Sequence, residues 1–142
     1  MWSEKVKFYG AWSNAADFDF DQLPENFILK ANNGDGKGTN KPVRGKSKLT
    51  DEQKNAIIKM MDEWLHRKNI GLLHAEPHYK NIPPLVIAEE LLPLPKGEST
   101  LIDYKMWCFN GKVHYIWTCS ERSADGSRAH VMLYDRDWNA CP

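Results

Sequence analysis

Lys30, at the end of a short apolar run and directly before a glycine-rich segment, is the first candidate for phosphate chemistry. It follows the residues FIL at 27–29, and from 32 to 48 the composition changes to Gly, Asn, Lys, Ser and Thr. Backbone N–H groups of such a loop, at Gly34 and Gly36 for example, can cradle phosphate oxygens while an ammonium adds positive charge. Loops of this composition without the Walker spacing are also common as solvated connections. The residues alone therefore leave phosphate binding and a plain surface loop both open.

Two adjacent carboxylates, Glu89 and Glu90, follow the apolar run LVIA at 85–88. Neighbouring residues of a strand point to opposite faces, so at most one of the two can look into a given site. Carboxylates at strand ends are most often left in water. The sequence does not choose between the two glutamates.

A third group of polar residues lies on a predicted hairpin around Asn110-Gly111, a pair that tolerates the positive φ of a type I′ turn. The two-residue turn predicts Phe109 opposite Lys112, Met106 opposite Tyr115 and Asp103 opposite Thr118. One face is then expected to join a core, and it carries Tyr104, Met106, Cys108, Val113, Tyr115 and Trp117. The other face carries Asp103, Lys105, Trp107, His114, Ile116 and Thr118.

Asp103 and Lys105 are two residues apart on this strand and so share a face, where they can form an ion pair. An exposed pair of this kind contributes less than about 1 kcal/mol. Metal binding is not predicted, because Pro77 interrupts the helix that would align His74 with His78. Cys108 and Cys119 lie too far apart in the predicted register to form a disulfide.

Composition limits the classes of partner. Nineteen Lys and Arg balance nineteen Asp and Glu, which argues against generic nucleic-acid or membrane-surface binding. The sequence shows neither a membrane-spanning apolar stretch nor a signal-peptide core, so we expect a cytoplasmic protein without membrane insertion.

The elements that must position these residues form a mixed pattern. Thr50 and Gln53 match a capping box for an amphipathic helix over 51–68. Strands are expected at 27–31, at 85–92, in the hairpin and near 130–134, with 32–48 as a loop and 1–20 lying against the core. The predicted fold class is α+β: mainly antiparallel strands with the helix packed across them.

Four segments resemble the TupA-like (teichuronopeptide biosynthesis) branch of the ATP-grasp superfamily. They are DFDQLPENFILKANNGDG at 19–36, EPHYKNIPPLVIAEELL at 76–92, DYKMWCFNGKV at 103–113 and YDRDW at 134–138. The resemblance implies a single partial ATP-grasp domain: a first lobe over 1–84, a hinge strand at 85–92 and the start of a second lobe over 93–142.

The resemblance also implies roles on the ATP side of the site. Lys30 would contact the phosphates beside Gly34 and Gly36, and Lys46 falls where related chains carry a further lysine. Glu89 or Glu90 would take the ribose hydroxyls at the hinge.

In the second lobe, the resemblance implies that Lys105 faces the phosphates and that Asp103 orients it. Arg122 would be a second cation on the transferred group, although it could equally be an exposed loop residue.

The implied activity is that of an ATP-dependent carboxylate–amine ligase acting in surface-polysaccharide or teichuronopeptide biosynthesis, with ATP and Mg²⁺ as cofactors. Its carboxylate and amine substrates are not indicated by the sequence. The family's metal ligands come from strands downstream of the hairpin, so we expect them beyond Pro142 and predict none among the present residues. The alternative is a non-catalytic nucleotide-binding or interaction module that keeps the fold without a complete metal site.

Overall fold

The computed structural model describes residues 5–34, 38–67, 77–94, 100–121, 123 and 128–142. The chain divides into two compact units, Met1–Leu92 and Pro93–Pro142. Each unit is built around its own antiparallel sheet.

The sheet of the first unit has four strands in the order β1-β4-β2-β3, and every neighbouring pair is antiparallel. Their bounds are β1 Phe8–Trp12, β2 Asn26–Ala31, β3 Asn40–Arg44 and β4 Val86–Glu90. β4, the strand with the paired carboxylates, is thus an inner strand that bonds to β1 on one side and to β2 on the other.

The two faces of this sheet differ. One face is buried, and its residues include Phe27, Leu29, Val43, Val86 and Ala88. In the alternating register, the opposite face carries Ile28, Lys30, Ile87 and Glu89, all of which are partly exposed. Apolar side chains therefore anchor β2 and β4 from behind, while a lysine and a glutamate stand on the other side.

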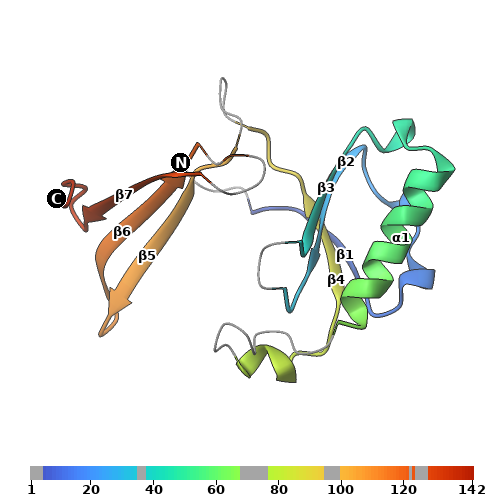
Figure 1. Ribbon diagram of the computed structural model, residues 1–142, viewed down its shortest axis with the longest axis horizontal. Coiled ribbons are helices and arrows are strands. Elements are labelled where there is room, and N and C mark those ends of the chain that lie inside the picture. The colour runs from blue at the N-terminus through green and yellow to red at the C-terminus, as the bar shows by residue number, and fades with distance from the viewer. Residues whose placement is uncertain (1–4, 35–37, 68–76, 95–99, 122, 124–127) are drawn as a thin grey trace. The chain divides into compact units, whose positions relative to one another are not determined.

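Helix α1, Asp51–Leu65, packs along the buried face of this sheet (Figure 1). The predicted capping box is confirmed: Gln53 N donates to Thr50 Oγ1, and Thr50 N donates to the Gln53 side chain. The helix ends three residues before the predicted Lys68. A tighter turn ends it, because Arg67 N bonds back to the Trp64 carbonyl, and no buried side chain follows Leu65 in the described residues up to 67.

The prediction of an uninterrupted loop over 32–48 is wrong, because β3 lies within it. β3 pairs with β2 from Asn26↔Arg44 to Lys30↔Asn40. Val43 is its one buried residue, so the strand lacks the alternating apolar pattern that would have revealed it. Short 3₁₀ helices complete the unit: η1 Ala15–Asp17, η2 Phe20–Gln22, η3 Lys46–Lys48 and η4 Pro77–Asn81.

The second unit is a three-stranded sheet of β5 Asp103–Phe109, β6 Lys112–Ser120 and β7 His130–Asp135, in that order. The predicted turn is confirmed by positive φ at both Asn110 and Gly111. Phe109 pairs with Lys112 as predicted, and Cys108 pairs with Val113 in the same register. Beyond Cys108 the register shifts by one residue, because His114 forms a bulge before the pair Trp107↔Tyr115.

The bulge corrects the predicted faces of the hairpin. Beyond it Asp103 lies opposite Cys119 and Met106 opposite Ile116, so Tyr115 and Trp117 join the face of Lys105. The predicted core face is not a core within the described residues, since Tyr104, Met106 and Tyr115 are each at least 41% exposed. Only Ile116 and Cys119 are buried among the described residues of this unit.

The three cysteines are free, as expected for Cys108 and Cys119. Among the described residues, the structure holds no helix that is long and apolar enough to cross a membrane.

Candidate functional site

The open face of the first sheet brings together two of the predicted site residues, Lys30 and Glu89. The Lys30 ammonium lies 2.6 Å from Glu89 Oε2, and the two side chains are 40% and 24% exposed. They come from neighbouring strands and are 59 residues apart in the chain. Their contact follows from the register, in which Lys30 pairs with Ile87 and Ile28 with Glu89. A diagonal pair on one sheet face is within reach of long side chains.

Glu90 has a different environment. Its carboxylate accepts a hydrogen bond from Lys7 N at 3.2 Å, and its own N–H bonds to the Lys7 carbonyl at 2.8 Å. Successive strand residues alternate between faces, so Glu89 is the glutamate that shares the face of Lys30. The structure thus separates two carboxylates that the sequence could not distinguish.

The chain makes a tight turn immediately after β2, where the glycine-rich segment begins. Gly34 N donates to the Ala31 carbonyl at 3.1 Å, and a Cβ added at Gly34 would lie 2.3 Å from Thr39 Oγ1. Glycine is needed here because Thr39 is itself 4% exposed and cannot move aside easily. Gly36 falls outside the described residues.

Asn33 is buried in the same turn, and its Oδ1 has no hydrogen-bond partner among the described residues. A buried acceptor of this kind costs about 1–3 kcal/mol when left unsatisfied. Ionised phosphate oxygens accept hydrogen bonds, and an amide oxygen also only accepts them, so Asn33 Oδ1 cannot bond to a phosphate. The adjacent Asn32 has a structural role: its side chain bonds to Pro83 O and to Leu85 N, which ties the end of β2 to the start of β4.

Lys46 is held by the backbone of its own unit. Its ammonium donates to the carbonyls of Phe20, the first residue of η2, at 2.9 Å and of Leu23, directly after η2, at 2.6 Å. These bonds stabilise the connection into β2. A contact between Lys46 and a ligand stays a prediction.

In the second unit, Lys105 is ion-paired with Asp103, as the two-residue spacing predicts. The bulge adds an aromatic neighbour, since the Lys105 ammonium lies 5.4 Å from the centroid of the Trp117 ring. Cation–π attraction therefore helps to orient this lysine. Arg122 lies outside the described residues. Lys30 and Lys105 belong to different units, so their convergence on one polyphosphate stays a prediction.

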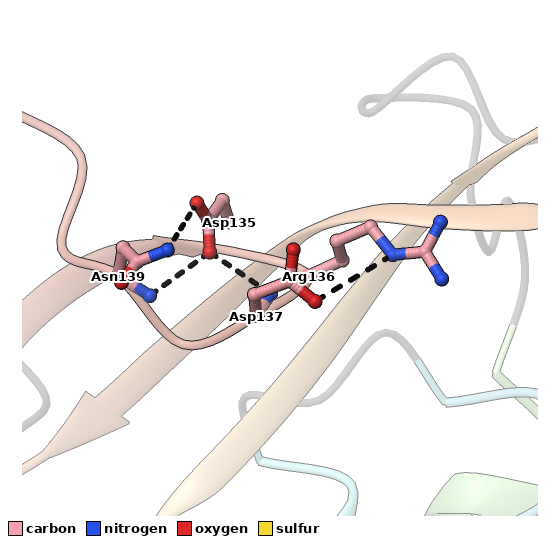
Figure 2. Close-up of polar contacts among 4 residues, drawn as sticks. All are labelled: Asp135, Arg136, Asp137 and Asn139. Carbon is pink, nitrogen blue, oxygen red and sulfur yellow. Dashed lines mark hydrogen bonds and ion pairs between the residues drawn. The ribbon is translucent and has the colours of Figure 1, made fainter.

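A polar turn after β7 was missed from the sequence (Figure 2). The Asp135 carboxylate accepts hydrogen bonds from Asp137 N, Asn139 N and Asn139 Nδ2, each at 2.9 Å. The pKa of Asp135 is lowered, chiefly by the Asn139 side chain. The turn holds Trp138 at a positive φ of +66°. The Trp138 ring lies edge-on to the Tyr104 ring, with 6.1 Å between the ring centroids. The signal was the cluster of Asp and Asn, which often close turns by side-chain bonds to the backbone.

The chemistry that the described site residues can offer follows from the charges of Lys30 and Glu89. In the part of the chain that the structure describes, no three His, Cys, Asp or Glu side chains gather into a group that could hold a metal ion. Lys30 can offer an ammonium on an exposed sheet face, and Glu89 can accept hydrogen bonds from hydroxyl or amino groups. A ligand with both an anionic part and a donor-bearing part matches this pair.

The chain matches a known protein family. The protein family described as TupA-like ATPgrasp matches residues 4–142, essentially the whole chain. No curated protein and no solved structure matches the chain significantly.

Proposed function

The chain belongs to the TupA-like ATP-grasp family, and on this premise we propose that the open face of its first sheet binds ATP. The Lys30–Glu89 pair carries the proposal. Lys30 is the next-to-last residue of β2, before the glycine-rich segment, and Glu89 lies on the neighbouring inner strand β4. Lys30 contacts phosphate oxygens, while Glu89 accepts hydrogen bonds from the nucleoside.

The arrangement is chemically suited to this role. An ammonium paired with a phosphate forms a charge-assisted hydrogen bond, worth about 1.5–3 kcal/mol. The apolar contacts behind β2 and β4 fix both backbones, so binding orders few new groups. The turn at Gly34 folds the chain back toward Ala31, next to Lys30. Backbone N–H groups near this turn can donate hydrogen bonds to the phosphates.

At the finer level, we propose an ATP-dependent carboxylate–amine ligase in surface-polysaccharide or teichuronopeptide biosynthesis. The γ-phosphoryl group passes to a carboxylate oxygen, giving an acyl phosphate and ADP. An amine then displaces phosphate and forms the amide. Lys105, oriented by Asp103 and Trp117, offsets charge on the transferred group, and Arg122 is proposed as a second cation.

Magnesium supplies further charge compensation in such chemistry. Among the described residues, no three His, Cys, Asp or Glu side chains gather, and the ligase proposal assigns magnesium no ligand in them.

The test is a titration of ATP with Mg²⁺ into the 142-residue chain by calorimetry. We expect Lys30→Ala to weaken binding by about 10- to 150-fold, the equivalent of one charge-assisted hydrogen bond. Lys41→Ala is the matched control, because Lys41 pairs with Leu29 and so lies on the other face of the same sheet. Wild-type binding that Lys30→Ala leaves unchanged would defeat the proposal.

The same titration with Lys105→Ala tests the contribution of the second unit. A lower affinity of this variant for ATP would support the proposed contact between Lys105 and the phosphates. Release of ADP and phosphate that requires both an acid and an amine supports the ligase, whereas ATP binding without turnover for any pair favours the binding module.

A further inference from the structure

The Lys30–Glu89 ion pair has a consequence for selectivity, which rests on the proposed nucleotide site. The same ammonium that is proposed to bind phosphate already lies 2.6 Å from a carboxylate. Any polyanion that approaches Lys30 therefore approaches Glu89 as well.

Two physical effects weaken the binding of a polyphosphate that carries no nucleoside. Phosphate oxygens must share or replace the hydrogen bond between Lys30 and Glu89, and their charge is repelled by the carboxylate within a few ångströms. Both effects are moderate in strength, because the side chains are 40% and 24% exposed and water screens them in part. Among the described contacts, this is the ion pair that joins two different strands of the first sheet.

A nucleotide differs from a bare polyphosphate in one relevant respect. Its sugar and base carry hydroxyl and amino groups, which can donate hydrogen bonds to a carboxylate that has lost part of its contact with Lys30. Inorganic triphosphate has no such donors and leaves the Glu89 carboxylate uncompensated. The cost of disturbing the pair is thus offset for one ligand and not for the other.

We infer that Glu89 is a specificity-determining residue that selects nucleoside triphosphates against inorganic polyphosphate by holding Lys30. A selective role predicts the opposite change in triphosphate affinity from a purely supporting role for Glu89. Removal of its charge should improve the binding of triphosphate, although it removes an observed contact of Lys30.

The experiment compares the dissociation constants of inorganic triphosphate and ATP, each with Mg²⁺, for wild type and Glu89→Gln. We expect triphosphate to bind the variant roughly three- to tenfold more tightly. ATP should gain less or lose affinity, so the preference for ATP over triphosphate falls. Far-UV circular dichroism and thermal unfolding check that the variant is folded.

Glu90→Gln is the matched control, because it removes the same charge from the neighbouring residue whose carboxylate contacts Lys7 N. It should leave the preference for ATP within about twofold of wild type, since its charge is not in contact with Lys30. Glu89→Asp is a second variant, which keeps the charge but shortens the side chain; it should give an intermediate change.

The inference is overturned if Glu89→Gln binds triphosphate no better than wild type, including the case in which neither binds detectably. It is also overturned if Glu90→Gln has the same effect, because general charge would then explain the gain. Failure of the proposed function is a separate result, in which wild type does not bind ATP or binds it independently of Lys30.

Discussion

The two units hold their candidate lysines in different ways. Lys30 is paired with a glutamate 59 residues away on another strand, in a partly buried setting over a packed core. Lys105 is paired with a neighbour two residues away on its own exposed strand. The Lys30 pair depends on a long-range contact and the Lys105 pair on a local one, so similar substitutions should have different effects at the two sites.

The largest expected difference concerns the residues that support each strand. Leu29→Ala removes a fully buried side chain directly behind Lys30 and should cost about 2–5 kcal/mol of unfolding free energy. Met106→Ala, at a 53% exposed position beside Lys105, should stay within about 0.5 kcal/mol. Chemical denaturation of both variants measures the difference; equal costs would contradict the contrast between the units.

Glycine substitutions should sharpen the comparison at a smaller scale. Gly34→Ala should cost about 1–3 kcal/mol because its Cβ meets the buried Thr39. Gly111→Ala has open space, but its φ of +74 should cost about 1–2 kcal/mol.

Asparagine distinguishes the two causes, because it tolerates a left-handed backbone and is larger than alanine. Gly111→Asn should be milder than Gly111→Ala, and Gly34→Asn should be more damaging than Gly34→Ala. Thermal denaturation of the four variants ranks their stabilities. If alanine and asparagine had the same rank order at both sites, one cause would act at both.

The two ion pairs should differ by less than about 1 kcal/mol. A double-mutant cycle with Lys30→Met and Glu89→Gln should give the larger coupling energy, and one with Lys105→Met and Asp103→Asn should give a value near zero. Raising the salt concentration should reduce the coupling between Lys30 and Glu89 only in part, because partly buried charges are screened less than exposed ones. A larger coupling for Lys105 would reverse the comparison.

The smallest effects concern two carboxyl groups with lowered pKa values. Glu25 owes its lowered pKa first to Ser47 N and then to the Ser47 hydroxyl, 22 residues away, whereas Asp135 owes its own chiefly to the nearby Asn139 side chain. A carboxyl group whose pKa is lowered by folding stabilises the fold above its unfolded pKa, and this contribution is lost as pH falls through the folded pKa.

NMR titration of the carboxyl groups can separate the two cases. Asn139→Ala should raise the pKa of Asp135 and leave that of Glu25 unchanged. Ser47→Ala should raise the pKa of Glu25 in part, since the Ser47 N–H bond remains, and should not alter Asp135. A change in the distant carboxyl group would argue against the assigned causes.

Local features were predictable from a few neighbouring residues. The capping box of Thr50 and Gln53, the Asn110-Gly111 turn and the Asp103–Lys105 pair each depend on residues at most three apart. The α+β class and the approximate positions of α1, β2, β4 and β7 followed from apolar patterns. The family resemblance, confirmed over residues 4–142, supplied the candidate chemistry.

The sequence by itself therefore determined short-range geometry and the residue types of the site. The tertiary structure alone decided that Glu89 faces Lys30, that β3 lies inside the glycine-rich segment and that a bulge at His114 moves Trp117 beside Lys105. Strand order and register set these contacts. Both arise from packing among distant segments, and a shift of one residue changes the face on which each side chain lies.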